Sequence, residues 1–373
     1  MAVQPLATWR IRLCVFLLSA GILFFEILLM RVFAVQYWHH FASFIISLAL
    51  LGFGAGGSLL YLLRGRLESI LENLLFFLPL ALSLCLWVTL LFLELLVFNP
   101  FLTFLQGDDI LQLLLLVAAV FVPFFLGALA IGACFSVAAG GVFGLYFVNL
   151  AGSAAGCLLL FLTWFHLEPH VLLLLLSLLA ACASGAAARG PRRILFSALT
   201  ILLMPLLYGS FFQDRSLEMS PVKDLAQARR AEGAVTEHER FGPLGLVTVL
   251  SGPSFHYLPD LSLNCPYRLP EQKGLFIDGN TVGAINRFSG DPGQLGFMSW
   301  RTASLAYELL DEPRVLVIGG GGGSEVLNAR YHGARDISVV ELNADVVSLM
   351  NGPYRDYGGA VYGSGPVRVF AEE

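Results

Sequence analysis

The sequence predicts a polytopic α-helical membrane domain followed by a smaller α/β domain. Hydrophobic residues make up 57% of the 373 residues and charged residues only 13%, whereas about a quarter of the residues in a soluble protein are charged. The charges are also unevenly distributed, because 15 lie in residues 1–212 and 34 lie in residues 213–373. The two parts of the chain are therefore suited to different solvents.

The first part contains repeated apolar runs that are long enough to cross a bilayer, for which a helix needs roughly 20 apolar residues. Backbone polar groups in lipid must bond within their own segment, so these runs are expected to be helices. The run after Arg10 and Arg12 resembles a signal peptide, but it is long and lacks a small-x-small cleavage site, which favours a retained helix. The predicted spans are 11–33, 43–63, 73–98, 110–138, 141–165, 169–188 and 194–212.

Several polar residues of the membrane domain are functional candidates. Glu26, Arg31 and Glu94 are ionisable groups in or near spans, where such groups are often functional; Arg31 could equally snorkel to the interface while Glu26 pairs locally. Two groups of residues could bind a metal: His39 with His40, and His166 with Glu168 and His170. Both groups lie at predicted loop ends, which favours the interpretation that they are interfacial loop residues. We therefore assign no metal site.

Glycine runs in the membrane domain are interpreted as packing positions, because small residues let membrane helices approach closely. They are Gly52, Gly54, Gly56, Gly57, Gly152 and Gly156. The six cysteines form no CxxC pair, so neither a disulfide framework nor a zinc site is predicted. The net charge of −5 offers no basic footprint for a nucleic-acid partner.

The second part begins with a polar linker and a small β-rich segment. A short helix is expected from Ser220 to Arg230, and the alternating, β-branched stretch 244–251 predicts a strand. Residues 274–285 predict a hairpin that turns at Asp278-Gly279-Asn280, and a helix is expected over 295–310. These predictions give three regions: 1–212 in the membrane, 213–312 as linker and β-rich part, and 313–373 as an α/β domain.

The α/β domain opens with the pattern of a nucleotide-binding unit. A continuous apolar strand, 315–318, is followed at once by Gly319 to Gly323, by a helix from Ser324, and by a second strand that ends in Glu341. In such a unit the glycines allow close approach of the ligand to the backbone, and the acid accepts hydrogen bonds from ribose hydroxyls. Five consecutive glycines fit a dinucleotide motif poorly and favour an adenosyl-sulfonium ligand; a glycine turn without a ligand is the alternative.

The chain resembles a known enzyme family at these motifs. VLVIGGGGGSEVL followed by ISVVELNADVV resembles the first two motifs of class I adenosylmethionine-dependent enzymes, in particular the spermidine synthase family, and LFIDGNTVGAI resembles that family's LxLDGxxQ strand. Residues 25–28, 47–54 and 146–152 are similar to the membrane signatures of bacterial membrane-fused spermidine synthase-like proteins. The resemblance implies a Rossmann-like, class I methyltransferase-type fold.

The resemblance also implies roles for individual residues. Gly319, Gly320, Gly321 and Gly323 would lie against the nucleoside and the methionine-derived chain of S-adenosylmethionine, or of its decarboxylated form, bound as co-substrate. Glu341 would bind the ribose hydroxyls, and Glu373 would contact the adenine side.

Three departures from the family pattern limit this assignment. Gly322 stands where the family's GGGDGG loop carries an acid that helps hold the aminopropyl amine, and the sequence at 297–301 replaces the family's YHE segment. Only three of about seven strands can be placed, at 314–318, 337–341 and 367–371, and the family's catalytic aspartate would lie beyond residue 373. We therefore expect a fragment of a longer chain that is inactive alone, and assign no catalytic residue within it.

Three functions remain open from the sequence. The first is aminopropyl transfer from decarboxylated S-adenosylmethionine to a polyamine or other small amine, and the second is methyl transfer from S-adenosylmethionine. In the third, the membrane helices transport a solute or handle lipid, with Glu26 and Glu94 as key residues, and the nucleotide fold is a degenerate sensor or a nucleoside binder without chemistry. The lipid bilayer is a partner in each case, and the oligomeric state is left open.

The expected location is a multi-pass position in a bacterial inner membrane. Lys and Arg near span ends mark the cytoplasmic side. The arginines near span ends all fit one alternation of the first six spans with the N-terminus inside; they are Arg10, Arg12, Arg64, Arg66, Arg189, Arg192 and Arg193. Asp108 and Asp109 lie in a loop that this alternation places outside. If 194–212 also crosses, the soluble domain lies outside. Because this run is short and contains Pro205 and Gly209, it could be re-entrant or interfacial, and we expect the soluble domain to face cytosolic nucleotides.

Overall fold

The computed structural model describes residues 8–38, 40–95, 110–137, 141–211, 218–242, 244–363 and 365–371. The chain divides into two compact units, Met1–Pro221 and Val222–Glu373. The first is helical and the second contains all the described strands. The division lies nine residues after the predicted end of the membrane domain at 212, and the predicted β-rich and α/β regions belong to one unit.

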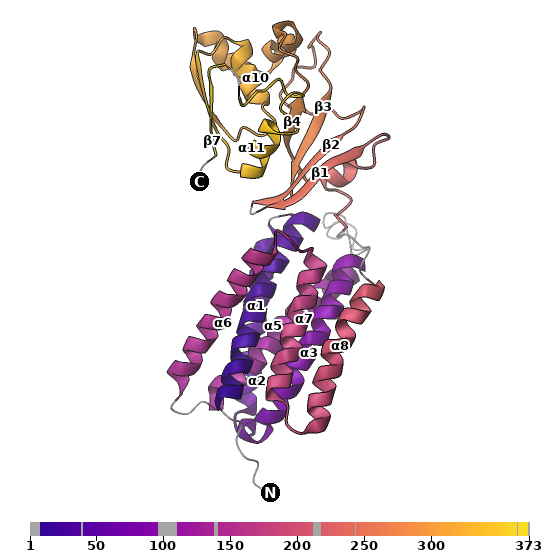
Figure 1. Cartoon of the computed structure of the whole chain (residues 1–373), viewed down its shortest axis with the longest axis vertical. Helices are drawn as coiled ribbons and strands as arrows, with labels where there is room; N and C mark the ends of the chain where they lie inside the picture. The colour runs from indigo at the N-terminus through magenta and orange to yellow at the C-terminus, as the bar shows by residue number, and fades with distance from the viewer. Residues whose placement is uncertain are drawn as a thin grey trace. The chain divides into compact units, whose positions relative to one another are not determined.

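In the described part of the first unit there are seven long apolar helices, and they run side by side in Figure 1. Their bounds are α1 Thr8–Gln36, α2 Phe41–Leu63, α3 Leu67–Leu95, α5 Ile110–Val137, α6 Val142–Thr163, α7 Pro169–Ala187 and α8 Pro191–Phe211. Each contains a stretch of 19 to 28 residues that is long and apolar enough to cross a membrane. These helices coincide with the predicted spans and indicate a multi-pass membrane protein.

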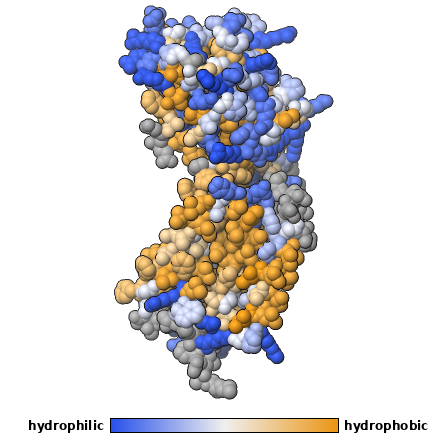
Figure 2. Space-filling view, viewed as in Figure 1, coloured by the Kyte–Doolittle hydropathy of each residue, from blue (hydrophilic) through white to orange (hydrophobic). Residues whose placement is uncertain are grey.

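Apolar side chains dominate the visible face of this helical unit, whereas hydrophilic ones are common on the visible face of the second unit (Figure 2). On α2 the outward side chains Leu50, Leu51 and Leu62 are 68%, 58% and 78% exposed. Such a surface is unfavourable in water and suits the hydrocarbon core of a bilayer.

Glycines bring neighbouring helices of the bundle into close contact. A Cβ atom at Gly152 of α6 would lie 2.4 Å from the carbonyl oxygen of Phe16 of α1. One at Gly156 would lie 2.1 Å from the carbonyl oxygen of Ala20. Gly52 and Gly56 of α2 approach α5 in the same way. The predicted packing role is confirmed at these four positions, whereas Gly54 and Gly57 face open space.

Hydroxyl and amide side chains add hydrogen bonds between helices, as expected where no water is present. Ser83 of α3 donates to the carbonyl oxygen of Ser177 of α7 at 2.7 Å, and Ser184 of α7 donates to that of Phe76 at 2.8 Å. Gln36, at the end of α1, donates to the carbonyl oxygen of Leu93 at 2.7 Å.

The second unit contains two sheets. An antiparallel meander has the order β1 Val235–Gly242, β2 Gly245–Ser251, β3 Gln272–Ile277 and β4 Asn280–Asn286. A parallel sheet has the order β5 Arg314–Ile318, β6 Asp336–Val340 and β7 Val367–Phe370. The helical segments are α9 Asp224–Ala228, η1 Pro292–Trp300, η2 Thr302–Leu309, α10 Ser324–Tyr331 and α11 Ala344–Asn351. The unit is therefore an α/β domain with a β-meander, as predicted at this coarser level.

One hydrophobic core joins the two sheets. Val247 and Leu275 of the meander belong to the same buried cluster as Val317 and Ile337 of the parallel sheet and Val346 of α11. This shared core explains why residues 222–373 form one unit, because neither sheet alone has enough apolar surface to bury.

The continuous apolar strand 315–318 is of the type that is buried on both faces of a parallel sheet, but the structure buries only one of its faces. Val317 points into the core and is 6% exposed, but Leu316 and Ile318 are 62% and 80% exposed. Successive side chains of a strand point to opposite faces, and in the described chain only one face of this sheet is packed against the rest of the unit.

Two further local expectations need correction. The helix expected over 295–310 is two 3₁₀ segments separated at Arg301, whose backbone is extended with φ −91° and ψ 143°. The helix expected over 220–230 is limited to Asp224–Ala228. β1 forms where the sequence predicts a polar linker, because its residues, VTEHERFG, show no alternation of apolar and polar side chains.

Candidate functional site

The glycine loop links β5 to α10 at the carboxyl end of the parallel sheet. β5 and β6 pair in parallel from Arg314 with Asp336 to Ile318 with Val340, and the N–H of Gly319 continues the ladder by donating to the carbonyl oxygen of Val340 at 2.8 Å. Gly319, Gly321 and Gly323 have φ values of 79°, 49° and 83°. Only glycine adopts such values without strain, so alternate residues of the run are required by the backbone itself.

The remaining glycines serve close packing. A Cβ atom at Gly320 would lie 2.2 Å from the hydroxyl of Tyr362, and one at Gly322 would lie 2.3 Å from the carbonyl oxygen of Ala284 on β4. By contrast, nothing lies within 4 Å of a Cβ at Gly319, and only the carbonyl oxygen of Val282, at 3.8 Å, lies near one at Gly321. The loop therefore packs with one side on the protein and leaves the other side open.

This packing gives a physical reason for one departure from the family pattern. Gly322 stands where the resembled loop carries an acid, and the β4 backbone at Ala284 and Ile285 fills the space that such a side chain would need. An acid at this position cannot be accommodated without displacing β4.

Glu341 lies at the end of β6, directly beside the loop. Its Oε2 accepts a hydrogen bond from the N–H of Gly321 at 2.8 Å, and its Oε1 accepts one from the N–H of Asn343 at 2.9 Å. The side chain is 7% exposed. Glu341 therefore holds the loop in place through Gly321. Each of its carboxylate oxygens can still accept a second hydrogen bond from another donor.

Tyr362 packs against the glycine loop and is not one of the pocket-lining residues. Its hydroxyl donates to the carbonyl oxygen of Gly321 at 2.9 Å. Burial, aided by the nearby negative charge of Glu341, raises the pKa of this phenol. Tyr362 thus remains a protonated donor, which fixes the orientation of the Gly321 peptide.

A pocket of about 300 Å³ opens against the exposed side of the loop. Its lining comes from four parts of the second unit: the loop before β3, strand β4, the break between η1 and η2, and the glycine loop with the start of α10. The lining residues are Tyr257, Leu258, Pro259, Asp260, Val282, Gly283, Ala284, Arg301, Ala303, Gly319 to Gly322, Ser324 and Glu325. This volume is at the lower end of the range for small-molecule sites.

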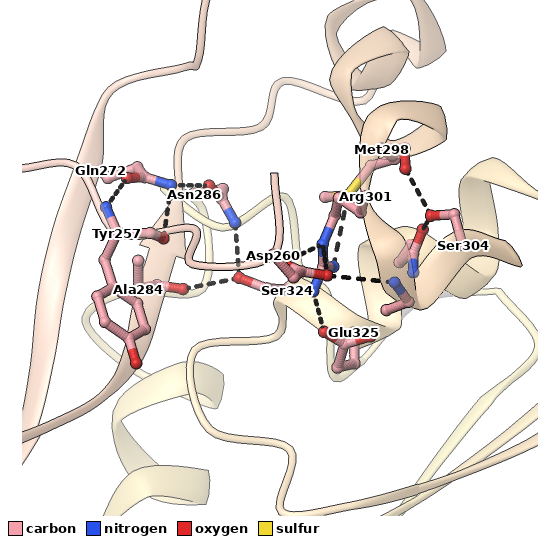
Figure 3. Close-up of polar contacts among 12 residues, drawn as sticks. Tyr257, Asp260, Gln272, Ala284, Asn286, Met298, Arg301, Ser304, Ser324 and Glu325 are labelled. Carbon is pink, nitrogen blue, oxygen red and sulfur yellow. Dashed lines mark hydrogen bonds and ion pairs between the residues drawn. The ribbon is translucent and has the colours of Figure 1, made fainter. Parts of the chain in front are cut away.

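Three charged side chains of the pocket form one cluster, shown in Figure 3. Nε of Arg301 donates to both carboxylate oxygens of Asp260, at 3.0 and 3.1 Å, and Nη2 of Arg301 donates to Glu325. The Arg301 side chain is 5% exposed, against 22% for Asp260 and 42% for Glu325. The cluster carries one more negative than positive charge, and its acids are more accessible than its base.

The ionisation of Arg301 is fixed by this cluster. Burial disfavours the charged form, but the hydrogen bonds that Arg301 donates to Asp260 and Glu325 outweigh it, so the pKa of Arg301 is raised. The guanidinium therefore remains a permanent cation that holds both acids in place.

A hydrogen-bonded chain connects the meander to the start of α10 (Figure 3). Gln272 donates to Asn286 at 2.7 Å, Asn286 donates to Ser324 at 2.8 Å, and Ser324 donates to the carbonyl oxygen of Ala284 at 3.1 Å. Gln272 and Asn286 are a cross-strand pair of β3 and β4. The chain therefore fixes the glycine loop relative to the strand that forms the opposite wall of the pocket.

The predicted site residues are only partly brought together. Gly319, Gly320 and Gly321 line the pocket, Gly323 is packed against Val361, and Glu341 accepts from the N–H of Gly321 without being one of the lining residues. Glu373 lies outside the described residues. Asp260 and Arg301 could not be predicted as a pair from the sequence, because they are 41 residues apart in the chain and no local pattern links them.

Among the residues that the structure describes, the ionisable candidates of the membrane helices do not form a comparable site. Glu26 and Arg31 are both half-buried on α1, and the side chain of Glu94 lies outside the described residues. His39 lies outside them too, while His170 pairs with Glu168 at 2.7 Å and stacks on Tyr208. Within the described ranges, no group of three or more His, Cys, Asp or Glu residues is placed to hold a metal ion.

Comparisons with protein-family models, with curated proteins and with solved structures gave no match to this chain.

Proposed function

We propose that the second unit binds an adenosyl sulfonium compound and that the protein is a membrane-bound transferase of the spermidine synthase-like type. In this proposal β5, the glycine loop, α10 and β6 are the start of a Rossmann-like fold. The observation that carries it is the open side of the loop: Gly319 and Gly321 face a pocket of about 300 Å³, and Glu341 contacts the same loop.

The charge of the pocket supports a cationic ligand. An adenosyl sulfonium carries a positive sulfur and an amino group, and Asp260 and Glu325 offer accessible carboxylates, while Arg301 is enclosed by them. In the proposed complex the backbone of Gly319 and Gly321 lies along the ligand, Glu341 accepts from the ribose hydroxyls, and Asp260 with Glu325 holds the amino end. These two acids would take over the task of the acid that Gly322 replaces.

The leading reaction is aminopropyl transfer from decarboxylated S-adenosylmethionine to a polyamine. The accepting amine attacks the propyl carbon next to sulfur, the carbon–sulfur bond breaks, methylthioadenosine leaves, and the amine loses a proton. Methyl transfer from S-adenosylmethionine is the second candidate, because it uses the same type of fold and the same type of donor with a different leaving group. The two differ in the product that the spent donor yields.

The test uses the full chain in nanodiscs. Binding of S-adenosylmethionine, its decarboxylated form and methylthioadenosine is measured by calorimetry for the native protein and for Glu341→Gln. We expect binding of at least one ligand and a loss of about tenfold in the variant, which corresponds to one charge-assisted hydrogen bond. Glu271→Gln, a change in an exposed ion pair with Arg287, is the matched control. A folded protein that binds none of the three ligands would refute the proposal.

Product analysis of the natural protein at its full natural length then separates the reactions. Methylthioadenosine formed only in the presence of a polyamine would support aminopropyl transfer, and adenosylhomocysteine formed with a membrane extract would support methyl transfer. Binding without either product would favour a sensor role for the second unit.

We further propose that the second unit faces the cytoplasm, where adenosyl co-substrates are made. α8 is one continuous helix through Pro205 and is long enough to cross. With seven crossings the two ends of the helical unit lie on opposite sides, so a cytoplasmic second unit requires an N-terminus outside. This is against the prediction from all the arginines near span ends, which are Arg10, Arg12, Arg64, Arg66, Arg189, Arg192 and Arg193. Leu263→Cys, at a fully exposed position of the second unit, reports the side through a membrane-impermeant maleimide. Labelling in intact cells would refute the cytoplasmic location.

A further inference from the structure

A second cavity lies within the helical unit, at the end of the α2–α3 hairpin. Its volume is about 540 Å³. The last turns of α2, the connecting turn and the first residues of α3 line it on one side, and Gly132 and Ser136 near the end of α5 line it on the other. Ends of membrane helices lie at the level of the lipid headgroups, so this cavity is placed where headgroups are found.

The cavity carries one cation and one anion that are held apart. Arg64 lies over the ring of Tyr61, with 4.3 Å between the guanidinium carbon and the ring centroid. Glu68 lies in the first turn of α3 and lines the same cavity. Among the described residues neither side chain has an ion-pair partner within 4 Å, although they are only four residues apart. A separated pair of opposite charges is complementary to a dipolar ligand.

Glycines keep the cavity open. A Cβ atom at Gly57 or Gly65 would meet nothing within 4 Å, whereas one at Gly132 would lie 2.5 Å from the side chain of Leu60. Gly132 therefore allows α2 and α5 to approach, and Gly57 and Gly65 leave space above the contact. Leu60 and Leu67 supply an apolar wall.

We propose that this cavity binds the headgroup of a zwitterionic phospholipid. Arg64 takes the phosphate, as guanidinium groups do, and Glu68 takes the ammonium group. The acyl chains extend along the outer face of α2, where Tyr61 and Leu62 are 64% and 78% exposed. The site is independent of the adenosyl-ligand proposal, because it belongs to the other unit of the chain.

The experiment is native mass spectrometry of the full chain released from detergent, with added phosphatidylethanolamine or phosphatidylglycerol. These lipids share the phosphate, but only the first has an ammonium group. We expect tighter retention of phosphatidylethanolamine by about fivefold, the usual effect of one headgroup charge contact. Glycerophosphoethanolamine, the soluble headgroup, should fail to compete at equal concentration; competition would identify a soluble phosphate compound as the ligand and overturn the lipid assignment.

Three variants locate the site, each checked for an unchanged melting temperature. Arg64→Gln should weaken both lipids about fivefold, and Glu68→Gln should remove the preference between them. Gly57→Leu should fill the cavity and prevent retention. The matched controls are Arg66→Gln, which changes the next arginine outside the lining, and Gly54→Leu, which adds a side chain one turn away in open space. Equal losses in variant and control, or a preference for phosphatidylglycerol, would overturn the proposal.

Discussion

Glycine performs different tasks in the two units of this chain. In the helical unit Gly152 and Gly156 have ordinary helical backbone, and their missing side chains let α6 touch the α1 backbone. In the second unit Gly319 and Gly321 have positive φ and open space beside them, so the backbone conformation, not the space, requires glycine. Helix packing in the membrane unit thus depends on the small size of glycine, whereas the loop of the second unit depends on the backbone conformations that glycine can adopt.

The largest expected effect follows from filling the helix contact. Gly156→Leu places a side chain where a Cβ alone would already lie 2.1 Å from the carbonyl oxygen of Ala20. A backbone oxygen cannot move aside as a side chain does, so we expect a loss of about 3 kcal/mol or more, measured as thermal stability in detergent. Gly54→Leu, which meets open space, should change stability little. Similar losses in both would show that the close α1–α6 contact does not hold the bundle together.

The buried charge cluster of the second unit should give the next largest effect. Arg301→Ala leaves Asp260 and Glu325 side by side without their cation, at an expected cost of about 3 kcal/mol. Arg287→Ala breaks a pair whose side chains are 64% and 56% exposed, and should cost less than about 1 kcal/mol. Urea unfolding followed by hydrogen exchange in residues 260–331, which include both sets of ion pairs, measures both. If Arg301→Lys had the stability of the native protein, a single positive charge would be enough to hold Asp260 and Glu325, and the several donors of a guanidinium group would not be required.

The two kinds of glycine within the loop can be compared directly. Gly322→Asp, which restores the acid of the resembled motif, should destabilise the second unit by about 2 kcal/mol, because the β4 backbone lies 2.3 Å from the new Cβ. Gly319→Asp meets no atom within 4 Å, and its cost should be limited to about 1 kcal/mol of backbone strain at φ 79°. Thermal unfolding of both variants tests the order, and a stable Gly322→Asp protein would reject the packing explanation.

The sequence predicted the features that depend on local pattern. Helix positions followed from runs of apolar residues, the β3–β4 hairpin from Asp278-Gly279-Asn280, and the β5–loop–α10 arrangement from the glycines after an apolar strand. Each of these signals is contained within about 20 neighbouring residues.

The features that were missed depend on contacts between distant residues. The break in the expected 295–310 helix occurs at Arg301, whose partners are 41 and 24 residues away. β1 is polar and is held by pairing with β2, so its sequence shows no strand pattern. The wall of the pocket opposite the glycine loop likewise comes from Asp260 and β4, and no sequence spacing indicates that they meet there.

A pH response confined to the second unit is expected to be similar in size to the effect of Gly322→Asp. Lys223 is 1% exposed and donates to the carbonyl oxygen of Asp278 at 2.6 Å. Burial lowers the pKa of its amine to about 8, although Asp278 and Asp224 oppose the shift. Between this value and 10.5, its ordinary pKa, the unfolded chain binds more protons than the folded one. The free energy of unfolding should therefore rise with pH, by about 2 kcal/mol from pH 7 to 9.5.

Hydrogen exchange corrected for intrinsic rates can measure this response in each unit separately. The rise should appear in residues 224–286, disappear in Lys223→Met, and persist in Lys273→Met, whose ammonium is paired with Glu237 at 2.6 Å. The range must end below pH 10, because burial raises the pKa of Tyr354 and Tyr357, and their ionisation in the unfolded chain would reverse the trend. An equal rise in the helical unit would show either that the response does not come from Lys223 or that the two units do not unfold independently; its loss in Lys223→Met distinguishes the two.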